Sequence, residues 1–364
     1  MKFHSNCLST NTNCHITENK KMPRIFFAVF IFFLFSINFT TNAQCSFNLT
    51  AKTDISNALV GTRISYLEEG PKQLSIEEVT RHSGFKENKA DVVNLGMTES
   101  YFWLRFSVCN SGYREQLMLH VDQPTLAHVE WYAPDVNGHY GSPDITGTDY
   151  PFNTRVFNIA GFAFPVSTEQ DGRKDYYLRI RGNTPLVLPV FLGTREVITA
   201  ESRKDNVFFG VYAGIILCMV LYNLFLKFSI RDDSSYTWYV LHTVFVGLTQ
   251  AGFTGYAFQY LWPDHPWLAN QSVFIFTCLV SIFGIIFMQT FLNMKAVLPK
   301  MNRVFYVFFA LYLIISALSL SGEYVTAYKI LQPTQGTVAI LILVISINLV
   351  RKGFKQARFY LFSW

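Results

Sequence analysis

Charged residues are scarce in this chain. Only 15% of its 364 residues are Asp, Glu, Lys or Arg, whereas 50% are hydrophobic and 35 are Phe. An ordinary soluble domain has roughly 25% charged residues. The net charge of +5 is small and no stripe of Lys and Arg is present, which argues against a nucleic-acid partner. Much of the chain is therefore expected to lie in a lipid bilayer.

Enzyme and metal motifs are also missing. The sequence has no Walker loop, HExxH, GxSxG, kinase or cyclase motif, so no enzymatic activity is predicted up to residue 364. Six cysteines show no CxxC or Cys/His spacing, so no metal and no other cofactor is expected. Cys45 and Cys109 fall in the polar part of the chain. A disulfide between them and two free thiols both stay open, because sequence cannot show whether they meet.

Residues 1–43 are interpreted as an N-terminal extension and a signal peptide. The basic residues Lys20, Lys21 and Arg24 precede the apolar run 25–37, and small residues follow before Gln44. Translation is expected to start at Met22. An uncleaved membrane anchor is the alternative.

Residues 44–203 are predicted to form an exported β-sandwich. Between residues 101 and 108 apolar and mixed residues alternate with period two, as Phe102, Leu104, Phe106 and Val108 against Tyr101, Trp103, Arg105 and Ser107. Similar runs cover 116–121, 128–132, 156–166, 175–181 and 186–192, separated by turn formers. Many short strands of this kind are typical of an antiparallel sandwich. Residues 75–80 fit either a strand or a helical turn.

Residues 204–364 are predicted to form a helical transmembrane domain. The run 207–228 is about 33 Å long as a helix, enough to cross a hydrocarbon core of roughly 30 Å. The spans are expected at 206–228, 236–257, 268–292, 303–321 and 329–350, and a sixth begins at 355–364. That last run is too short to cross, so the chain is expected to be part of a longer protein.

Loop charge predicts the orientation of these spans. The loops after the first, third and fifth spans contain Lys and Arg, whereas the loops 258–267 and 321–328 contain neither. The positive-inside rule therefore places residues 44–203 outside. We expect a multi-pass protein of a bacterial inner membrane with a periplasmic N-terminal domain.

Several short motifs resemble one family in their order and spacing. They are 103–105, 161–165 and 177–180 in the exported part, and 210–214, 221–225 and 259–263 in the membrane part. With these motifs, nearly the whole mature chain resembles the bacterial seven-transmembrane receptors with diverse intracellular signalling modules (7TMR-DISM). The resemblance implies a jelly-roll-like periplasmic sensor domain, a seven-helix membrane block and a cytoplasmic signalling module as effector. It also implies a periplasmic ligand, with carbohydrate as one class.

Candidate ligand residues are aromatic or basic strand residues. Trp103 and Arg105 share a strand face and suit a sugar or a carboxylate ligand. An aromatic ring stacks on the C–H face of a sugar, and a guanidinium group forms forked hydrogen bonds. Trp131 and Tyr132 are the second pair. The alternative for all four is a purely structural role, with the Trp rings packed inside the sandwich.

The first span has small residues four positions apart. Gly210 and Gly214 form a stripe that leads to Tyr222, with the polar Asn223 beside it. Small residues allow close helix approach within one bundle or in a homodimer, and packing within one bundle is the favoured interpretation. Asn223 is expected to face other helices, because a polar group at membrane depth needs a partner.

A transmembrane signalling receptor is the leading functional hypothesis. A transporter or channel-like protein with an accessory exported domain is the alternative, but no intramembrane carboxylate is present for ion coupling. A membrane-bound hydrolase of surface sugars is a third hypothesis, which would need carboxylates at catalytic distance.

Overall fold

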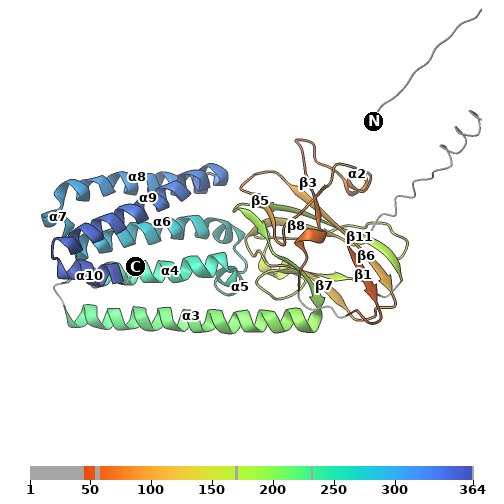
Figure 1. Cartoon of the computed structure of the whole chain (residues 1–364), viewed down its shortest axis with the longest axis horizontal. Helices are drawn as coiled ribbons and strands as arrows, with labels where there is room; N and C mark the ends of the chain where they lie inside the picture. Colours follow the sequence, from red (N-terminus) through yellow and green to blue (C-terminus); the bar gives the residue numbers. More distant parts are fainter. Residues whose placement is uncertain (1–44, 54–57, 169–170, 231–232, 363–364) are drawn as a thin grey trace, which may run out of the picture. The chain divides into compact units, whose positions relative to one another are not determined.

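A computed structural model describes residues 45–53, 58–168, 171–230 and 233–362 (Figure 1). These residues form β-sheets with a few short helical turns up to Thr194, and helices from Arg195 onward. The predicted fold class, a sandwich followed by a helical bundle, is confirmed. The predicted signal peptide lies outside the described residues.

The larger sheet has the strand order β4-β3-β6-β11-β8-β9, with β1 beside β6. Its neighbours are antiparallel except β1, which pairs with β6 in parallel. Cys45 and Cys109 form a disulfide with Cα atoms 5.8 Å apart, which decides the alternative that the sequence left open. The strands are β1 (Phe47–Thr50), β3 (Ser65–Glu68), β4 (Lys86–Glu87), β6 (Phe102–Ser111), β8 (Leu126–Tyr132), β9 (Asp144–Thr146) and β11 (Gly172–Gly182).

The smaller sheet has the order β10-β7-β13-β2, and β12 pairs with β5 separately. Its strands are β2 (Ala58–Leu59), β7 (Leu117–Val121), β10 (Phe162–Val166) and β13 (Val190–Thr194), and the separate pair is β5 (Val93–Gly96) with β12 (Leu186–Leu188). The run 186–192, expected as one strand, is broken at Pro189. Proline has no N–H to donate to a neighbouring strand, and the two halves enter different sheets.

One further strand prediction is corrected in the sandwich, and the open alternative at residues 75–80 is decided. The strand expected over 156–166 begins only at Phe162. Before it, the carbonyls of Ile159 to Gly161 accept hydrogen bonds from the Arg155 guanidinium instead of from a neighbouring strand. Residues 75–80 contain a helix, α2 (Ile76–Thr80), whose capping box joins Ser75 and Glu78. Two 3₁₀ turns, η1 (Gly61–Arg63) and η2 (Phe152–Thr154), complete the domain.

The larger sheet is covered on both faces. Its inner face supplies Phe102, Leu104, Phe106 and Val108 to the main core, as the period-two pattern predicts. Its outer face carries a second cluster, in which Trp103 packs with α2 residues such as Val79. This double burial explains why Trp103, on the outer face of β6, is as fully buried as the apolar residues of the inner face.

The helices follow β13 directly. They are α3 (Arg195–Ser229), α4 (Ser235–Phe253), α5 (Tyr256–Tyr260), α6 (Pro266–Phe291), α7 (Met294–Val297), α8 (Pro299–Leu320), α9 (Tyr324–Arg351) and α10 (Lys355–Phe362). Thr194, the last residue of β13, is also the N-cap of α3, since its side chain accepts a hydrogen bond from the Val197 N–H. The sandwich therefore enters the first long helix without a linker.

Four described helices are long and apolar enough to cross a bilayer: α3, α6, α8 and α9. Helix α4, in the place of the span expected at 236–257, is not among them and ends at Phe253, before Gly255 with φ +80°. Figure 1 shows α4, α6, α8 and α9 running beside one another, with α3 along one side. The most apolar window of α3 is 0% buried, so this helix packs less closely than the others.

Candidate functional site at the junction of sandwich and helices

The predicted ligand residues are only partly brought together. Trp103 is 0% exposed, and its ring lies 5.3 Å from the ring of Tyr132. Arg105, on the same strand face, places its guanidinium 4.2 Å from the Phe85 ring centroid. Trp131 lies on the opposite face, stacked on Tyr176 in the main core. Trp103, Arg105 and Tyr132 thus share the outer face of the larger sheet, over which the cluster with α2 packs. The ligand-binding role of all four residues stays a prediction.

A buried ionic cluster lies beside this aromatic face. Arg179 donates from Nε to Glu69 at 2.9 Å and from Nη1 to Glu130 at 2.8 Å. The hydroxyl of Tyr132 donates to Glu130 at 2.8 Å, and His128 Nε2 lies 2.7 Å from the other Glu130 oxygen. Burial alone would raise the pKa of Glu130, but these hydrogen bonds and the Arg179 charge lower it to about 2. Glu130 is therefore a carboxylate at neutral pH.

The charged groups continue along β11 toward the helices. Arg181, two residues after Arg179, forms an ion pair with Asp149 at 2.6 Å. The Tyr101 ring lies between the two arginines, 4.0 Å from the Arg179 guanidinium and 5.5 Å from that of Arg181. Asp149 follows β9, and its second carboxylate oxygen contacts a helix residue, Asn270. A row of ionic and cation–π contacts thus reaches from the sheet face to α6.

Asn270 is held by the sandwich alone. Its Oδ1 accepts hydrogen bonds from Thr148 Oγ1 at 2.6 Å and from Asn183 Nδ2 at 3.1 Å. Its Nδ2 donates to the Thr148 carbonyl at 3.3 Å and to Asp149 at 2.9 Å. Both acceptor sites and both donors of the amide are used. The orientation of this side chain in the first turns of α6 is therefore specified by three sandwich residues.

Aromatic packing accompanies these hydrogen bonds. The Phe152 and Phe258 rings meet edge to face at 5.6 Å, and Ala269 and Trp262 complete the cluster. The backbone N–H of Phe152 donates to the carbonyl of Pro263 at 2.8 Å. The contact between η2 and the α5–α6 segment is thus both apolar and directional.

Arg155 is a buried cation in the same junction. Its guanidinium donates to the carbonyls of Ala160, Gly161 at 3.0 Å and Pro124 at 3.1 Å. It also lies 4.2 Å from the Phe162 ring and 5.9 Å from the Phe258 ring. Four backbone carbonyls, including that of Ile159, and three aromatic rings, including that of Phe152, replace its water shell. Arg155 thereby holds the segment before β10 against α5.

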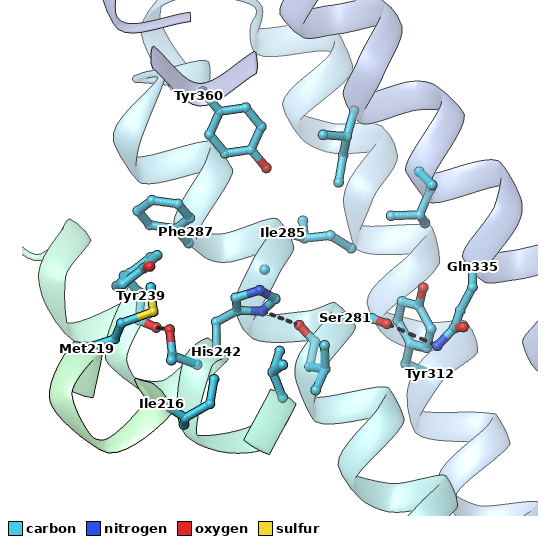
Figure 2. A pocket seen from close by; sticks show the side chains of 17 residues that line it. Ile216, Met219, Tyr239, His242, Ser281, Ile285, Phe287, Tyr312, Gln335 and Tyr360 are labelled. Carbon is cyan, nitrogen blue, oxygen red and sulfur yellow. Dashed lines mark hydrogen bonds between the residues drawn. The ribbon is translucent and has the colours of Figure 1, made fainter. Parts of the chain in front are cut away.

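The helical bundle contains a cavity of about 460 Å³ (Figure 2). His242 on α4 contributes to its wall, and its Nδ1 lies 3.0 Å from the Val280 carbonyl on α6. Gln335 on α9 donates to Ser281 at 3.5 Å, and the buried Tyr312 hydroxyl has no partner among the described residues. No group of three His, Cys, Asp or Glu suited to a metal occurs in the described part of the chain.

Two family models match this chain. The model for 7TM diverse intracellular signalling matches residues 205–364, and the model for the 7TMR-DISM extracellular 2 domain matches residues 61–194. The chain belongs to the 7TMR-DISM family. No curated protein matches it in sequence.

Membership in the 7TMR-DISM family indicates a transmembrane sensory receptor with an extracellular domain. The extracellular model ends at Thr194, the N-cap of α3, and the membrane model starts at Asp205 within α3. The junction described above thus joins the two matched parts of this 7TMR-DISM chain through α3 and, separately, through α5 and α6.

The small-residue stripe of α3 has no partner in the described bundle. A Cβ added at Gly210 or Gly214 would meet nothing within 4 Å, and Tyr222 is 62% exposed. Asn223, expected to face other helices, donates instead to the Met219 carbonyl of its own helix at 2.8 Å. Packing of this stripe, within one bundle or in a homodimer, stays a prediction.

The residues that make the junction were missed at the sequence level. Asn270 and Arg155 each lie in a short polar group beside apolar or aromatic residues, and Thr148 and Asp149 lie in a turn-rich stretch without any period. The polar position of Asn270 near the start of an apolar run is the one signal that could have drawn attention. Its partners are more than 80 residues away, so no local pattern contains them.

Proposed function

We propose that this chain is the sensor half of a transmembrane signalling receptor. In this proposal the extracytoplasmic sandwich binds a ligand, with carbohydrate as the first class to test. Binding changes the relation between the sandwich and the helices, and the helices transmit the change to a cytoplasmic signalling module. The chain itself carries no enzymatic activity in this proposal, and its location is a bacterial inner membrane with the sandwich in the periplasm.

The observation that supports the proposal is the complete hydrogen bonding of Asn270 by Thr148, Asp149 and Asn183. A signal needs two arrangements whose populations the ligand can shift by a few kcal/mol. A side chain fixed by several specific hydrogen bonds favours one arrangement over the other, because a shifted sandwich would leave these groups to water. The row of contacts from Glu130 through Arg179 and Arg181 to Asp149 connects that amide to the sheet face.

The experiment uses the whole chain in lipid nanodiscs with a panel of mono- and disaccharides. A sugar that raises the unfolding temperature should also change the hydrogen exchange of amides 147–160 and of the first turns of α6. The variants Trp103→Phe and Tyr132→Phe should weaken binding of that sugar if the aromatic face takes part. Stabilisation without any change at the junction would contradict coupling through Asn270.

The alternative function is transport, and adjoining cavities in the bundle favour it. The cavity of Figure 2 shares Val246, Val280 and Gln335 with a second cavity of about 340 Å³. No Asp, Glu, Lys or Arg is among the residues that line either one, which argues against ion-coupled transport. Flux of the stabilising sugar into proteoliposomes would support transport over signalling.

A further inference from the structure

A cavity of about 500 Å³ lies where the sandwich meets α3, α4 and α5. Two carboxylates line it, Asp122 directly after β7 and Asp205 on α3. Neither forms an ion pair or a side-chain hydrogen bond with a residue that the structure describes. One wall of the cavity thus comes from the extracellular domain and the other from the first long helix, each with a carboxylate that has no ion-pair partner among the described residues.

Aromatic rings form much of the remaining wall. Phe208, Phe209, Tyr212 and Phe253 are among them. Tyr256 is only 6% exposed, and its ring stacks on Phe209 with centroids 4.2 Å apart. Its hydroxyl makes no hydrogen bond with any described residue. The hydroxyl oxygen is not itself buried among the described residues, so on the cavity wall it is open to solvent and available to a ligand.

The Tyr256 hydroxyl lies near both carboxylates. Burial raises the pKa of Tyr256 to about 12, and the negative charges of Asp205 and Asp122 contribute to the increase. Tyr256 is in α5, which is not one of the four helices that could cross the bilayer. The phenol is therefore neutral at neutral pH and lies within the electrostatic influence of the two carboxylates.

Positive groups close to the cavity are already engaged or neutral. Lys204 pairs with Glu201 at 3.5 Å, and Arg155 lies behind the wall, bonded to the carbonyls of Ala160 and Gly161. His120 lines the cavity, but burial lowers its pKa, which Asp122 opposes. The imidazole is neutral at pH 7, so it does not balance the two carboxylates.

We propose that this cavity binds a small organic cation with an ammonium group. Carboxylates neutralise such a charge, and the faces of Phe and Tyr rings attract it by cation–π interaction. A metal ion would need more oxygen ligands than two carboxylates, and aromatic walls would not solvate it. A bound ammonium ion would bridge Asp122 of the sandwich and Asp205 of α3. Its binding would favour the docked arrangement of the two parts.

Binding can be measured on the whole chain in nanodiscs, with choline and putrescine as probes. Isothermal titration and thermal unfolding should both detect at least one of them at neutral pH. The neutral analogue 3,3-dimethylbutan-1-ol, which has the shape of choline, should bind at least about tenfold more weakly, because it lacks the charge. Calcium chloride serves as the inorganic comparison.

The variants Asp122→Asn and Asp205→Asn should each weaken binding of the cation by about tenfold, roughly 1.4 kcal/mol. Tyr256→Phe keeps the ring and tests the hydroxyl. The matched control is Asp264→Asn, which removes the same charge from an exposed loop residue. If one aspartate variant fails to fold, the other aspartate and Tyr256→Phe still test the site.

Three results would overturn the proposal. They are no binding of either probe to the folded chain, equal binding of the neutral analogue, and binding that is unchanged in the folded aspartate variants. The proposed sugar response is measured separately, so its failure and the failure of this site are distinguishable.

Discussion

Replacing Asn270 by alanine should release the sandwich from the N-terminal turns of α6. The change removes every hydrogen bond that the amide makes with Thr148, Asp149 and Asn183. The fold of the sandwich should survive, because Asn270 contributes nothing to either sheet. The variant thus separates docking from folding.

The magnitude follows from the number and kind of hydrogen bonds. A hydrogen bond between neutral groups contributes about 0.5–1.5 kcal/mol net, and one to a charged group about 1.5–3 kcal/mol. Three neutral bonds and one to Asp149 give an upper limit of roughly 3–7 kcal/mol. The groups that lose Asn270 form hydrogen bonds with water instead. We therefore expect the free energy of docking to become about 2–3 kcal/mol less favourable, which changes the equilibrium between docked and separated parts roughly 30- to 150-fold.

The amide of Phe152 reports this equilibrium directly. Its N–H donates to the carbonyl of Pro263 across the junction, so it exchanges with solvent only when the two parts separate. Its protection against hydrogen exchange should fall by the same roughly 30- to 150-fold in Asn270→Ala. Asn270→Asp should lower it at least as much, since a second carboxylate would face Asp149.

The control is Asn137→Ala, which changes an exposed asparagine in a turn of the sandwich. Protection of Phe152 should be unaffected there. Unchanged protection of Phe152 in a folded Asn270→Ala variant would refute the reasoning, and the docking would then depend on the aromatic cluster alone.

Three further predictions concern the stability of the sandwich. Replacing Cys45 and Cys109 by serine opens a covalent loop with a sequence separation of 64. It should lower the free energy of unfolding by about 4 kcal/mol, measured by thermal unfolding. Glu130 has a pKa of about 2 in the folded chain, against an ordinary value of 4.5. It should therefore add about 3 kcal/mol to the free energy of unfolding above pH 4.5, and this contribution is lost as the pH falls toward 2. Glu130→Gln should flatten this acid dependence of the unfolding temperature. Arg155→Met leaves four carbonyls without their donor and should lower the unfolding free energy by about 3 kcal/mol, measured by chemical denaturation.

Matched substitutions check each result. Cys218→Ser removes an exposed free thiol of α3 and should leave the unfolding temperature unchanged. Glu99→Gln and Arg203→Met alter exposed residues of the same types. An equal effect of any control and its test variant would show that the named contact is not the cause.

Local regularities made the fold class predictable. The alternation along residues 102–108 corresponds to β6. The apolar runs that are long enough to cross a bilayer correspond to α3, α6, α8 and α9. Boundaries were less predictable, because single residues change them. Pro189 divides one expected strand into two, and Gly255 ends α4 before its expected end.

The candidate site was predictable only where it lies on a regular strand. Trp103 and Arg105 share a face, as period two requires, but Tyr132 joins that face only through the pairing of β11 with β6 and β8. The burial of Trp103 depends on α2, an earlier segment of the chain. Trp131, adjacent to Tyr132 in sequence, necessarily points to the other face.

The division into an extracellular β part and a membrane part follows from the sequence, because strand alternation and hydrophobic length depend on neighbouring residues alone. The way in which the two parts meet depends on the tertiary structure. Thr148 and Asn270 are 122 residues apart, and their hydrogen bond exists because the sheets and the helices fold around them. A contact between two polar side chains so far apart in sequence leaves no period in either segment, so folding in three dimensions alone specifies it.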